Sequence, residues 1–200
     1  MPDGRWDRFF EDLEHQFAAE LDTERDEIAS ESERVRIARL GIRDRLVAAG
    51  PGADAAIEVG GAEPLHIVVE SVGRDWMAGS QGEGGALVVL PLASIDGFAL
   101  DRSGLSRSVK AVTEDPLTAR ITFGFVLRSL ARRRVHVTLV RRRAAALAGT
   151  PQRAGADHLD IALRDQDAAP RAGDVRAVQT VGFPAIAWVR LARRTDLGVI

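Results

Sequence analysis

The chain has 200 residues, with 27 basic and 29 acidic side chains, four histidines and a formal net charge of −2. Its hydrophobic content of 46% is typical of a folded protein and excludes a disordered one. It has no cysteine, which excludes disulfides, thiol nucleophiles and cysteine-ligated zinc.

Targeting signals are not found in the sequence. Residues 1–6 lack the basic start and apolar run of a signal peptide. The most apolar stretch, residues 86–95, has about half of the roughly 20 residues that a membrane-spanning helix needs. A chain without cysteine also suits a reducing compartment. We therefore expect a cytoplasmic protein that does not enter a membrane.

The N-terminal segment, residues 1–28, is predicted to form an amphipathic helical arm. Apolar residues recur there at steps of three and four, and the seven-residue step continues through Ile28 and Val35. Glu24 and Glu31 occupy alternate seam positions where a strong coiled coil would have leucine. A capping-box pattern at Thr23 leaves two alternatives open, one helix or two. The candidate interaction residues are Trp6, Phe9, Phe10, Leu13 and Phe17, which pack either on the rest of the chain or on a second copy.

The rest of the chain is predicted to contain two similar units, each a helix followed by about five short strands. The helix of the first unit should end near Ala49, before Gly50-Pro51-Gly52. The second helix is predicted over residues 117–134. We place the first unit at 29–100, a polar connector at 101–116, the second unit at 117–194 and a tail at 195–200.

A short sequence motif, which we call the repeated phrase, occurs once in each unit. It reads Val72-Gly73-Arg74-Asp75-Trp76-Met77 in the first and Ala154-Gly155-Ala156-Asp157-His158-Leu159 in the second. Gly73-Arg74 has the pattern of a type II′ hairpin turn, and Asp75 can accept a backbone N–H across it. We therefore expect one β-rich unit built twice. The structural turn residues are Gly73, Asp75, Gly155 and Asp157.

A helix followed by five short, bent strands resembles the Sm-like family of SH3-like small barrels, over roughly residues 33–100 and 117–191. The Gly and Asp of the repeated phrase are compatible with its first motif. Ile95-Asp96-Gly97 keeps the Ile and Gly of the second motif but places an acid where the family has a basic residue, and the second unit keeps only Ile186. The resemblance implies an α+β fold: an N-terminal amphipathic helical arm and two small Sm-like β-barrels, each preceded by a helix.

The whole chain also resembles uncharacterised proteins of GC-rich Gram-positive bacteria, some of which are labelled as Fis family transcriptional regulators. The opening Arg5-Trp6-Asp7-Arg8-Phe9-Phe10-Glu11-Asp12-Leu13 carries this resemblance. Fis-type proteins end in a helix-turn-helix, whereas residues 185–191 here are predicted to form a strand.

Catalytic and metal-binding patterns are not found in the sequence. The nearest approach to a metal cluster is His158 with Asp157 and Asp160, which supplies too few ligands on one strand face for zinc. The glycine-rich segment 79–85 lacks the helix that a phosphate loop needs. We expect no cofactor, no metal and no small-molecule substrate, and therefore a non-enzymatic protein. A catalytic site between the two units is a weaker alternative, which only a deep pocket with a perturbed acid or base would support.

Charge is unevenly distributed along the chain. About 12 acidic and about 4 basic residues precede residue 35, whereas about 15 arginines and about 5 acids lie between residues 120 and 194. We expect an interaction or scaffold protein that self-associates through the arm or through barrel edges, or that binds another protein. The alternative is a nucleic-acid-binding regulator that uses the arginines at the two ends of one predicted strand. These arginines form a single cationic surface only if both ends of the strand lie on one face of the protein. These residues are Arg132, Arg133, Arg134, Arg141, Arg142 and Arg143.

Overall fold

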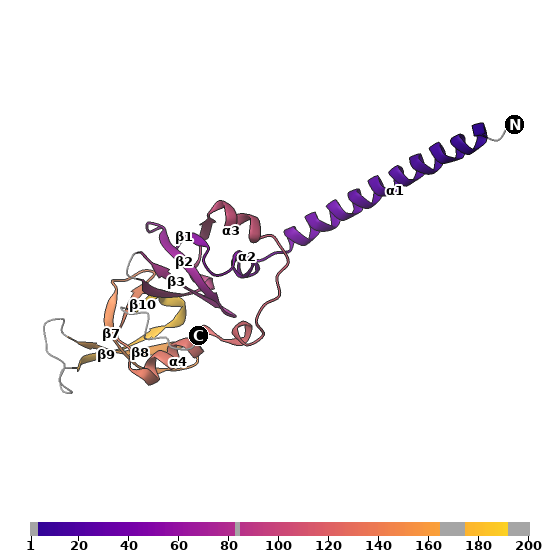
Figure 1. The fold of residues 1–200 in the computed structure, drawn as a ribbon. Coiled ribbons are helices and arrows are strands. Elements are labelled where there is room, and N and C mark those ends of the chain that lie inside the picture. Colours follow the sequence, from indigo (N-terminus) through magenta and orange to yellow (C-terminus); the bar gives the residue numbers. More distant parts are fainter. Residues whose placement is uncertain (1–3, 83–84, 165–174, 192–200) are drawn as a thin grey trace. The chain divides into compact units, whose positions relative to one another are not determined.

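The computed structural model describes residues 4–82, 85–164 and 175–191 (Figure 1). The chain divides into two compact units, residues 1–41 and residues 42–200, and each is described by itself. The first unit contains one long helix, α1 (Gly4–Ala38). The described residues of the second unit form a ten-stranded sheet with three α-helices and three short 3₁₀ helices.

Helix α1 is continuous through Thr23, so of the two alternatives the segment forms one helix. The capping-box pattern has no effect because Thr23 stays helical, and strong helix formers such as Glu24 and Glu27 follow it. Ion pairs of exposed side chains, Arg34 with Glu31 and Arg36 with Glu33, lie along the last turns of the helix. No helix of the described residues combines the length and apolar character needed to span a membrane.

The second unit begins with a helix and continues into five strands, and this succession then recurs. The elements of the first half are α2 (Ile42–Ala49), β1 (Asp54–Glu58), β2 (Leu65–Val72), β3 (Trp76–Gln81), β4 (Ala86–Pro91), η1 (Leu92–Ser94) and β5 (Gly97–Leu100). Between the halves lie α3 (Arg102–Arg107) and η2 (Thr118–Arg120). The second half contains α4 (Phe123–Arg133), β6 (Val137–Arg141), β7 (Leu147–Ala154), β8 (His158–Arg164), β9 (Val175–Gly182), η3 (Phe183–Ala185) and β10 (Ile186–Leu191).

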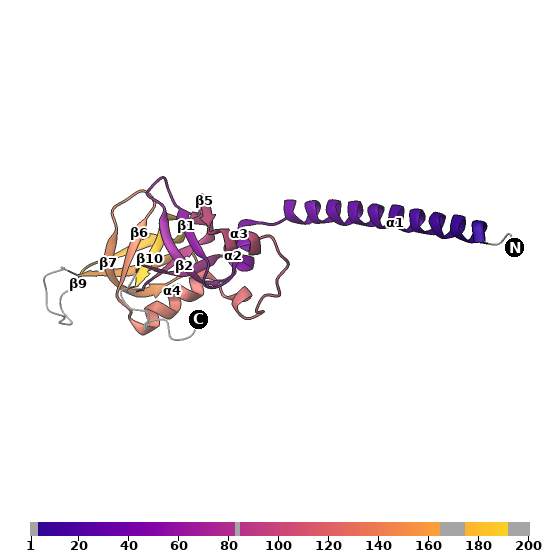
Figure 2. The same ribbon diagram turned by 45° about the horizontal axis from the view of Figure 1, so that its top comes forward.

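The expectation of two small barrels is wrong, because the ten strands form one open antiparallel sheet (Figure 2). Their order is β5-β1-β2-β3-β4-β10-β6-β7-β8-β9, and the outer strands β5 and β9 do not pair with each other. The two halves are joined where β4 pairs with β10, with Val89 opposite Val189 and Leu87 opposite Leu191. The sequence indicates the individual strands but not which strands pair, since the free backbone groups of an edge strand can pair with any other strand.

The central strands are buried on both faces, which explains why they join. Along β4, Leu87 and Val89 pack into one core, whereas Val88 and Leu90 pack into the other. In β3, Trp76 packs into the same core as Leu87, and Met77 packs into the other core. Successive side chains of a strand point to opposite faces, so a near-continuous apolar run such as Leu87–Leu90 fits only a strand that is covered on both sides.

Each core includes side chains from one helix and from several strands. The core beneath α4 contains Trp76, Leu87, Val89, Phe123, Val126, Leu127, Leu130, Leu139, Leu159, Ile161, Ile186, Val189 and Leu191, among others. The core beneath α2 contains Leu46, Ala49, Ile57, Leu65, Ile67, Val69, Met77, Val88, Leu90, Ile95 and Ala187, among others. Both cores therefore draw on both halves of the sequence.

The two halves repeat each other in strand order and in local hydrogen bonds. The order β5-β1-β2-β3-β4 recurs as β10-β6-β7-β8-β9. The Gly73 amide donates to the Trp76 carbonyl over 2.8 Å, and the Gly155 amide donates to the His158 carbonyl over 2.9 Å. The carbonyl of the phrase's aspartate accepts in both halves, from the amide of Leu92 in one and of Phe183 in the other. The repeated phrase thus corresponds to a repeated structure within one sheet.

The connector and the second helix differ from expectation. The segment predicted as an irregular connector contains α3, which starts because the Asp101 carboxylate accepts hydrogen bonds from the amides of Ser103 and Gly104. Hydrogen bonds from the Ser103 hydroxyl and these amides lower the pKa of Asp101. The helix predicted from residue 117 begins only at Phe123, because Thr122 is extended and accepts from the Phe125 amide as an N-cap.

A single cooperative unfolding transition is expected for the sheet, since neither core can open without exposing a strand of the other. Leu46→Ala lies in the α2 core and Leu127→Ala in the α4 core, and both leucines are fully buried. Each substitution should lower the free energy of unfolding by about 2–5 kcal/mol and shift the same transition. Urea unfolding followed by tryptophan fluorescence and by circular dichroism measures this.

Leu105→Ala, at a leucine that is 51% exposed, is the matched control and should leave the transition nearly unchanged. Two separate transitions, each sensitive to only one of the core variants, would show that the halves unfold independently.

Candidate interaction surfaces

The β2–β3 turn is fastened to the start of α4. The Asp75 carboxylate accepts a hydrogen bond from the Phe123 amide over 2.7 Å. The carbonyl of Ile121, just before the helix, accepts from the Arg74 amide and from the Trp76 indole N–H, each over 2.9 Å. The expectation that Asp75 accepts across its own turn is therefore wrong: its side chain reaches a helix 48 residues further along the chain.

Both glycines of the repeated phrase are required by close packing. A Cβ atom on Gly73 would lie 2.1 Å from the indole nitrogen of Trp76, and one on Gly155 would lie 2.4 Å from Cε1 of His158. Gly73 is not among the glycines with positive φ, so the predicted type II′ turn, which requires one, is wrong. In each half the aromatic side chain three residues later occupies the space in front of the glycine.

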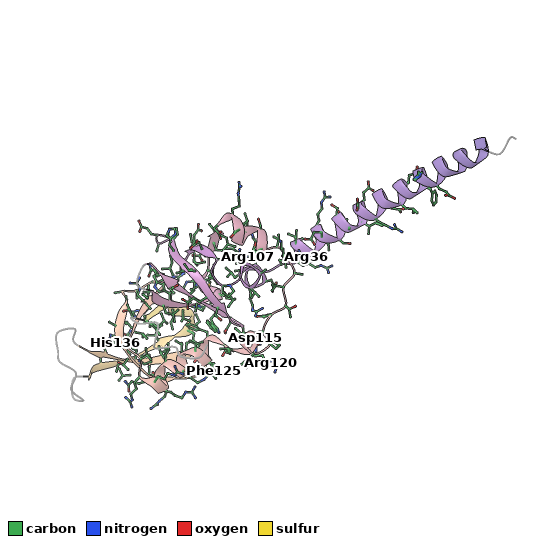
Figure 3. All side chains as sticks on the ribbon, viewed as in Figure 1. Arg36, Arg107, Asp115, Arg120, Phe125 and His136 are labelled. Atoms are coloured by element: carbon green, nitrogen blue, oxygen red, sulfur yellow. The ribbon has the colours of Figure 1, made fainter. Side chains whose placement is uncertain are left out.

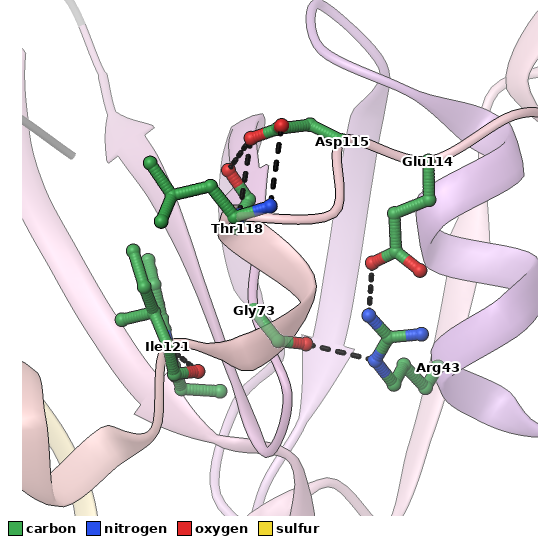
Figure 4. Close-up of polar contacts among 8 residues, drawn as sticks. Arg43, Gly73, Glu114, Asp115, Thr118 and Ile121 are labelled. Carbon is green, nitrogen blue, oxygen red and sulfur yellow. Dashed lines mark hydrogen bonds and ion pairs between the residues drawn. The ribbon is translucent and has the colours of Figure 1, made fainter.

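A partly buried arginine connects the same turn to the segment between the halves (Figure 4). Arg43, in α2, donates through Nε to the Gly73 carbonyl over 2.9 Å and forms an ion pair with Glu114. Close by, the Asp115 carboxylate accepts from the amide and the hydroxyl of Thr118. These hydrogen bonds, the Thr118 hydroxyl's first, lower the pKa of Asp115. The segment 110–122 is thereby held against the β2–β3 turn.

The corresponding aspartate of the second half has a different role. Asp157 is 86% exposed, and its carboxylate lies 2.8 Å from Nδ1 of the adjacent His158. This hydrogen bond lowers the pKa of the Asp157 carboxyl. Among the described residues no group of three or more His, Asp or Glu side chains is arranged to hold a metal ion. Two further histidines are exposed: His66 on a strand, and His136 beside one (labelled in Figure 3).

The two arginine triplets line different cavities. Arg132 and Arg133 lie in the last turn of α4, and Arg134 ends the helix in the left-handed conformation, with φ of 53°. Arg141 is the last residue of β6, and the strand separates it from Arg134. At about 3.3 Å per residue, the seven-residue interval corresponds to about 23 Å. The structure therefore does not bring all six arginines into one patch.

The first triplet contributes to a groove between α4 and β7, of about 430 Å³, which we call the α4–β7 groove. Arg132 and Arg134 line it together with two arginines that were not predicted as site residues, Arg128 of α4 and Arg153 of β7. Phe125, one turn before Arg128, completes one side and is 46% exposed (Figure 3). The lining is completed by Ala131, Gln152 and Ala154.

Part of the lining of the α4–β7 groove could be predicted from the sequence. Residues 125, 128 and 132 are spaced by three and four and therefore share one face of α4. The contribution of Arg153 was not readable, because it depends on the packing of α4 along β7.

The second triplet lines a cavity of about 570 Å³ beside η3 and the end of β9. Arg142 lies 3.7 Å from the Asp96 carboxylate and donates to the Ala93 carbonyl over 3.5 Å. Arg141 donates to the Ala145 carbonyl over 2.8 Å. Asp96 and Arg142 belong to different halves of the sheet, so their contact joins the halves. These contacts make Arg141 and Arg142 part of the fold's own polar network.

A further shallow cavity of about 630 Å³ covers the outer face of β1, β2 and β5. Its floor contains small or aliphatic side chains such as Ala56, Val68 and Ala99, with His66 at one side. Asp54 and Asp101 lie on its rim. Ser80 also lines it, and among the described residues no hydrogen bond joins Ser80 to His66.

The remaining candidate surface is the apolar stripe of α1. Of the predicted interaction residues, Phe17 is 65% exposed. The side chains of Trp6, Phe9, Phe10 and Leu13 lie outside the described residues, although their backbone is helical. Further along the helix, the apolar side chains at seven-residue spacing are all exposed. They are Leu21 at 38%, Ile28 at 61% and Val35 at 42%.

Comparisons of this chain with protein families, with curated proteins and with solved structures each gave no match.

The two aspartates of the repeated phrase provide a matched test of the turn. Asp75→Ala removes a tertiary acceptor from the first amide of α4 and should lower the free energy of unfolding by about 1 kcal/mol, as for the loss of a helix N-cap. Asp157→Ala removes only a contact to its exposed neighbour and should leave the urea midpoint unchanged. Equal effects of the two variants would contradict the assignment of Asp75 as the anchor of α4.

Proposed function

We propose that this protein is a non-enzymatic, cytoplasmic interaction protein that self-associates by pairing α1 with the α1 helix of a second copy. The expectation that two separate barrels form the scaffold has been overturned by the single sheet. The proposal therefore rests on α1, and on the exposed, heptad-spaced side chains of Leu21, Ile28 and Val35 in particular.

The spacing of these residues matches one half of a coiled-coil seam. A helix of 35 residues is about 52 Å long, at 1.5 Å per residue, and the three apolar side chains recur once every two turns along it. Exposed aliphatic side chains at this spacing are buried when a second helix packs against them, and burial stabilises each by about 1.5–3 kcal/mol. A second copy of α1 presents the same spacing and therefore a complementary seam.

The polar half of the seam should keep this pairing weak. Glu24 and Glu31 lie three residues after Leu21 and Ile28, on the same face of the helix. In a helix pair these carboxylates are brought together or lose part of their hydration, and both effects oppose association. The arrangement supports a reversible oligomer more than a permanent one.

Replacement of the central seam residue is expected to abolish pairing. Ile28→Glu places a charge where the partner helix must pack and should weaken self-association on the order of 100-fold. Ser30→Glu, two residues away and outside the seam, adds the same charge and should leave the association constant nearly unchanged. Analytical ultracentrifugation of the full chain over a concentration series measures both. A monomeric wild-type chain throughout that range would overturn the proposed function.

The opposite change should strengthen pairing. Glu24→Leu combined with Glu31→Leu converts the polar half of the seam to the residue that coiled coils prefer there. We expect self-association to tighten at least tenfold, because two apolar layers replace two charged ones. Thermal unfolding followed by circular dichroism at 222 nm, the helical band, should also become concentration-dependent. An unchanged mass and an unchanged melting curve for this double variant would argue against an α1 seam.

A further inference from the structure

The α4–β7 groove concentrates positive charge without neutralising it. Its lining includes four guanidinium groups, from Arg128, Arg132, Arg134 and Arg153, and no carboxylate. Within the described residues, none of the four forms an ion pair. Four like charges around one groove repel each other, so the arrangement favours a bound anion that offsets the repulsion.

The hydrogen bonds that these arginines make are few and long. Arg128 donates to the Gly155 carbonyl over 3.4 Å, and Arg134 donates to the Gln152 side-chain oxygen over 3.5 Å. Each guanidinium has five N–H donors, so most of the donors in the groove are available to a ligand. Planar guanidinium groups match the oxygen pairs of phosphate groups and can donate to them in a bidentate manner.

An exposed aromatic side chain lies beside these charges. Phe125 and Arg128 are neighbours on one face of α4, and Phe125 is 46% exposed although it is apolar. A phenyl ring next to phosphate-binding arginines can stack on a nucleobase. Bases within a duplex are already stacked on each other, so only an unpaired base can reach the ring.

We propose that the α4–β7 groove is a binding site for single-stranded nucleic acid. Arg128, Arg132, Arg134 and Arg153 contact the phosphodiester backbone, and Phe125 stacks on an unpaired base. The site does not depend on pairing of α1, so it stands or falls separately from the proposed function. Backbone contacts and one stacked base carry little sequence information, so recognition depends on strandedness more than on sequence.

The local charge balance supports a polyanion at this end of the chain. Residues 102–200 contain 18 basic and 8 acidic side chains, whereas residues 1–41 contain six basic and 12 acidic ones. The opposite sign of α1 makes an acidic protein segment the competing ligand. The two ligands differ in what they require, because an acidic peptide needs the arginines but has no base to stack on Phe125.

The test uses the full-length chain with fluorescein-labelled oligothymidylate, oligouridylate and an acidic oligoglutamate peptide. Fluorescence anisotropy with oligonucleotides of about 12 nucleotides should give dissociation constants on the order of micromolar at low salt. With four phosphate contacts, the logarithm of the association constant should fall with the logarithm of salt concentration with a slope of roughly −3. Comparison of the two oligonucleotides shows whether DNA or RNA is preferred, and both outcomes support the site.

Two pairs of variants locate the site. Arg128→Ala, Arg132→Ala and Arg153→Ala in one chain should reduce the salt slope by about 2 and nearly abolish binding. Arg102→Ala, Arg120→Ala and Arg190→Ala removes the same charge from exposed positions elsewhere and should retain the slope. Phe125→Ala should weaken oligonucleotide binding about tenfold, whereas Leu117→Ala, at a residue that is 71% exposed outside the groove, should not.

Three results would overturn the proposal. The first is no salt-dependent binding of either oligonucleotide. The second is equal loss of binding in the two triple-arginine variants, which would indicate a diffuse charge effect. The third is oligoglutamate binding that matches oligonucleotide binding and is insensitive to Phe125→Ala, which would identify an acidic protein segment as the ligand. Unchanged thermal unfolding of each variant ensures that a loss of binding is not a loss of fold.

Discussion

The pairing of β4 with β10 is the contact on which the rest of the second unit depends. It joins two five-stranded halves through three residue pairs, and the side chains of β4 pack into both cores. Each half alone would expose one face of β3 and β4, with Trp76, Leu87 and Val89 facing water. Those side chains instead belong to the core that α4 covers. The halves are therefore not modules placed next to each other but one sheet with two cores that share its centre.

Joining the two halves into one sheet also reduces the number of exposed strand edges. An unpaired edge strand presents a row of free amides and carbonyls that promotes aggregation. Two separate open units would have four such edges, and the fused sheet has two, β5 and β9. Asp96 and Arg142, from opposite halves, lie 3.7 Å apart near this junction. The acid at residue 96 thus has a structural role, because its partner is an arginine of the other half.

The repeated phrase shows how two copies of one pattern acquire different roles. Both copies place an aromatic ring against a glycine, and both use the aspartate carbonyl as an acceptor. In the first copy the ring is the fully buried Trp76, and the neighbouring Asp75 holds the start of α4. In the second copy the ring is His158, which is 41% exposed and bonds to Asp157. The first turn thus faces another element of the fold, whereas the side chains of the second turn face solvent.

The sequence alone determined the local elements. Alternation of apolar residues located the strands, the glycines marked the repeated turns, and seven-residue spacing located the stripe of α1, because each of these signals is a period or a steric requirement within a short segment. The tertiary structure decided which strands became neighbours, where Asp75 found its donor, and which arginines share a groove. Arg132 and Arg134 meet Arg153 because α4 packs along β7, whereas the strand β6 keeps Arg141 away. Such choices depend on contacts between residues far apart in the chain, and no period within a segment encodes them.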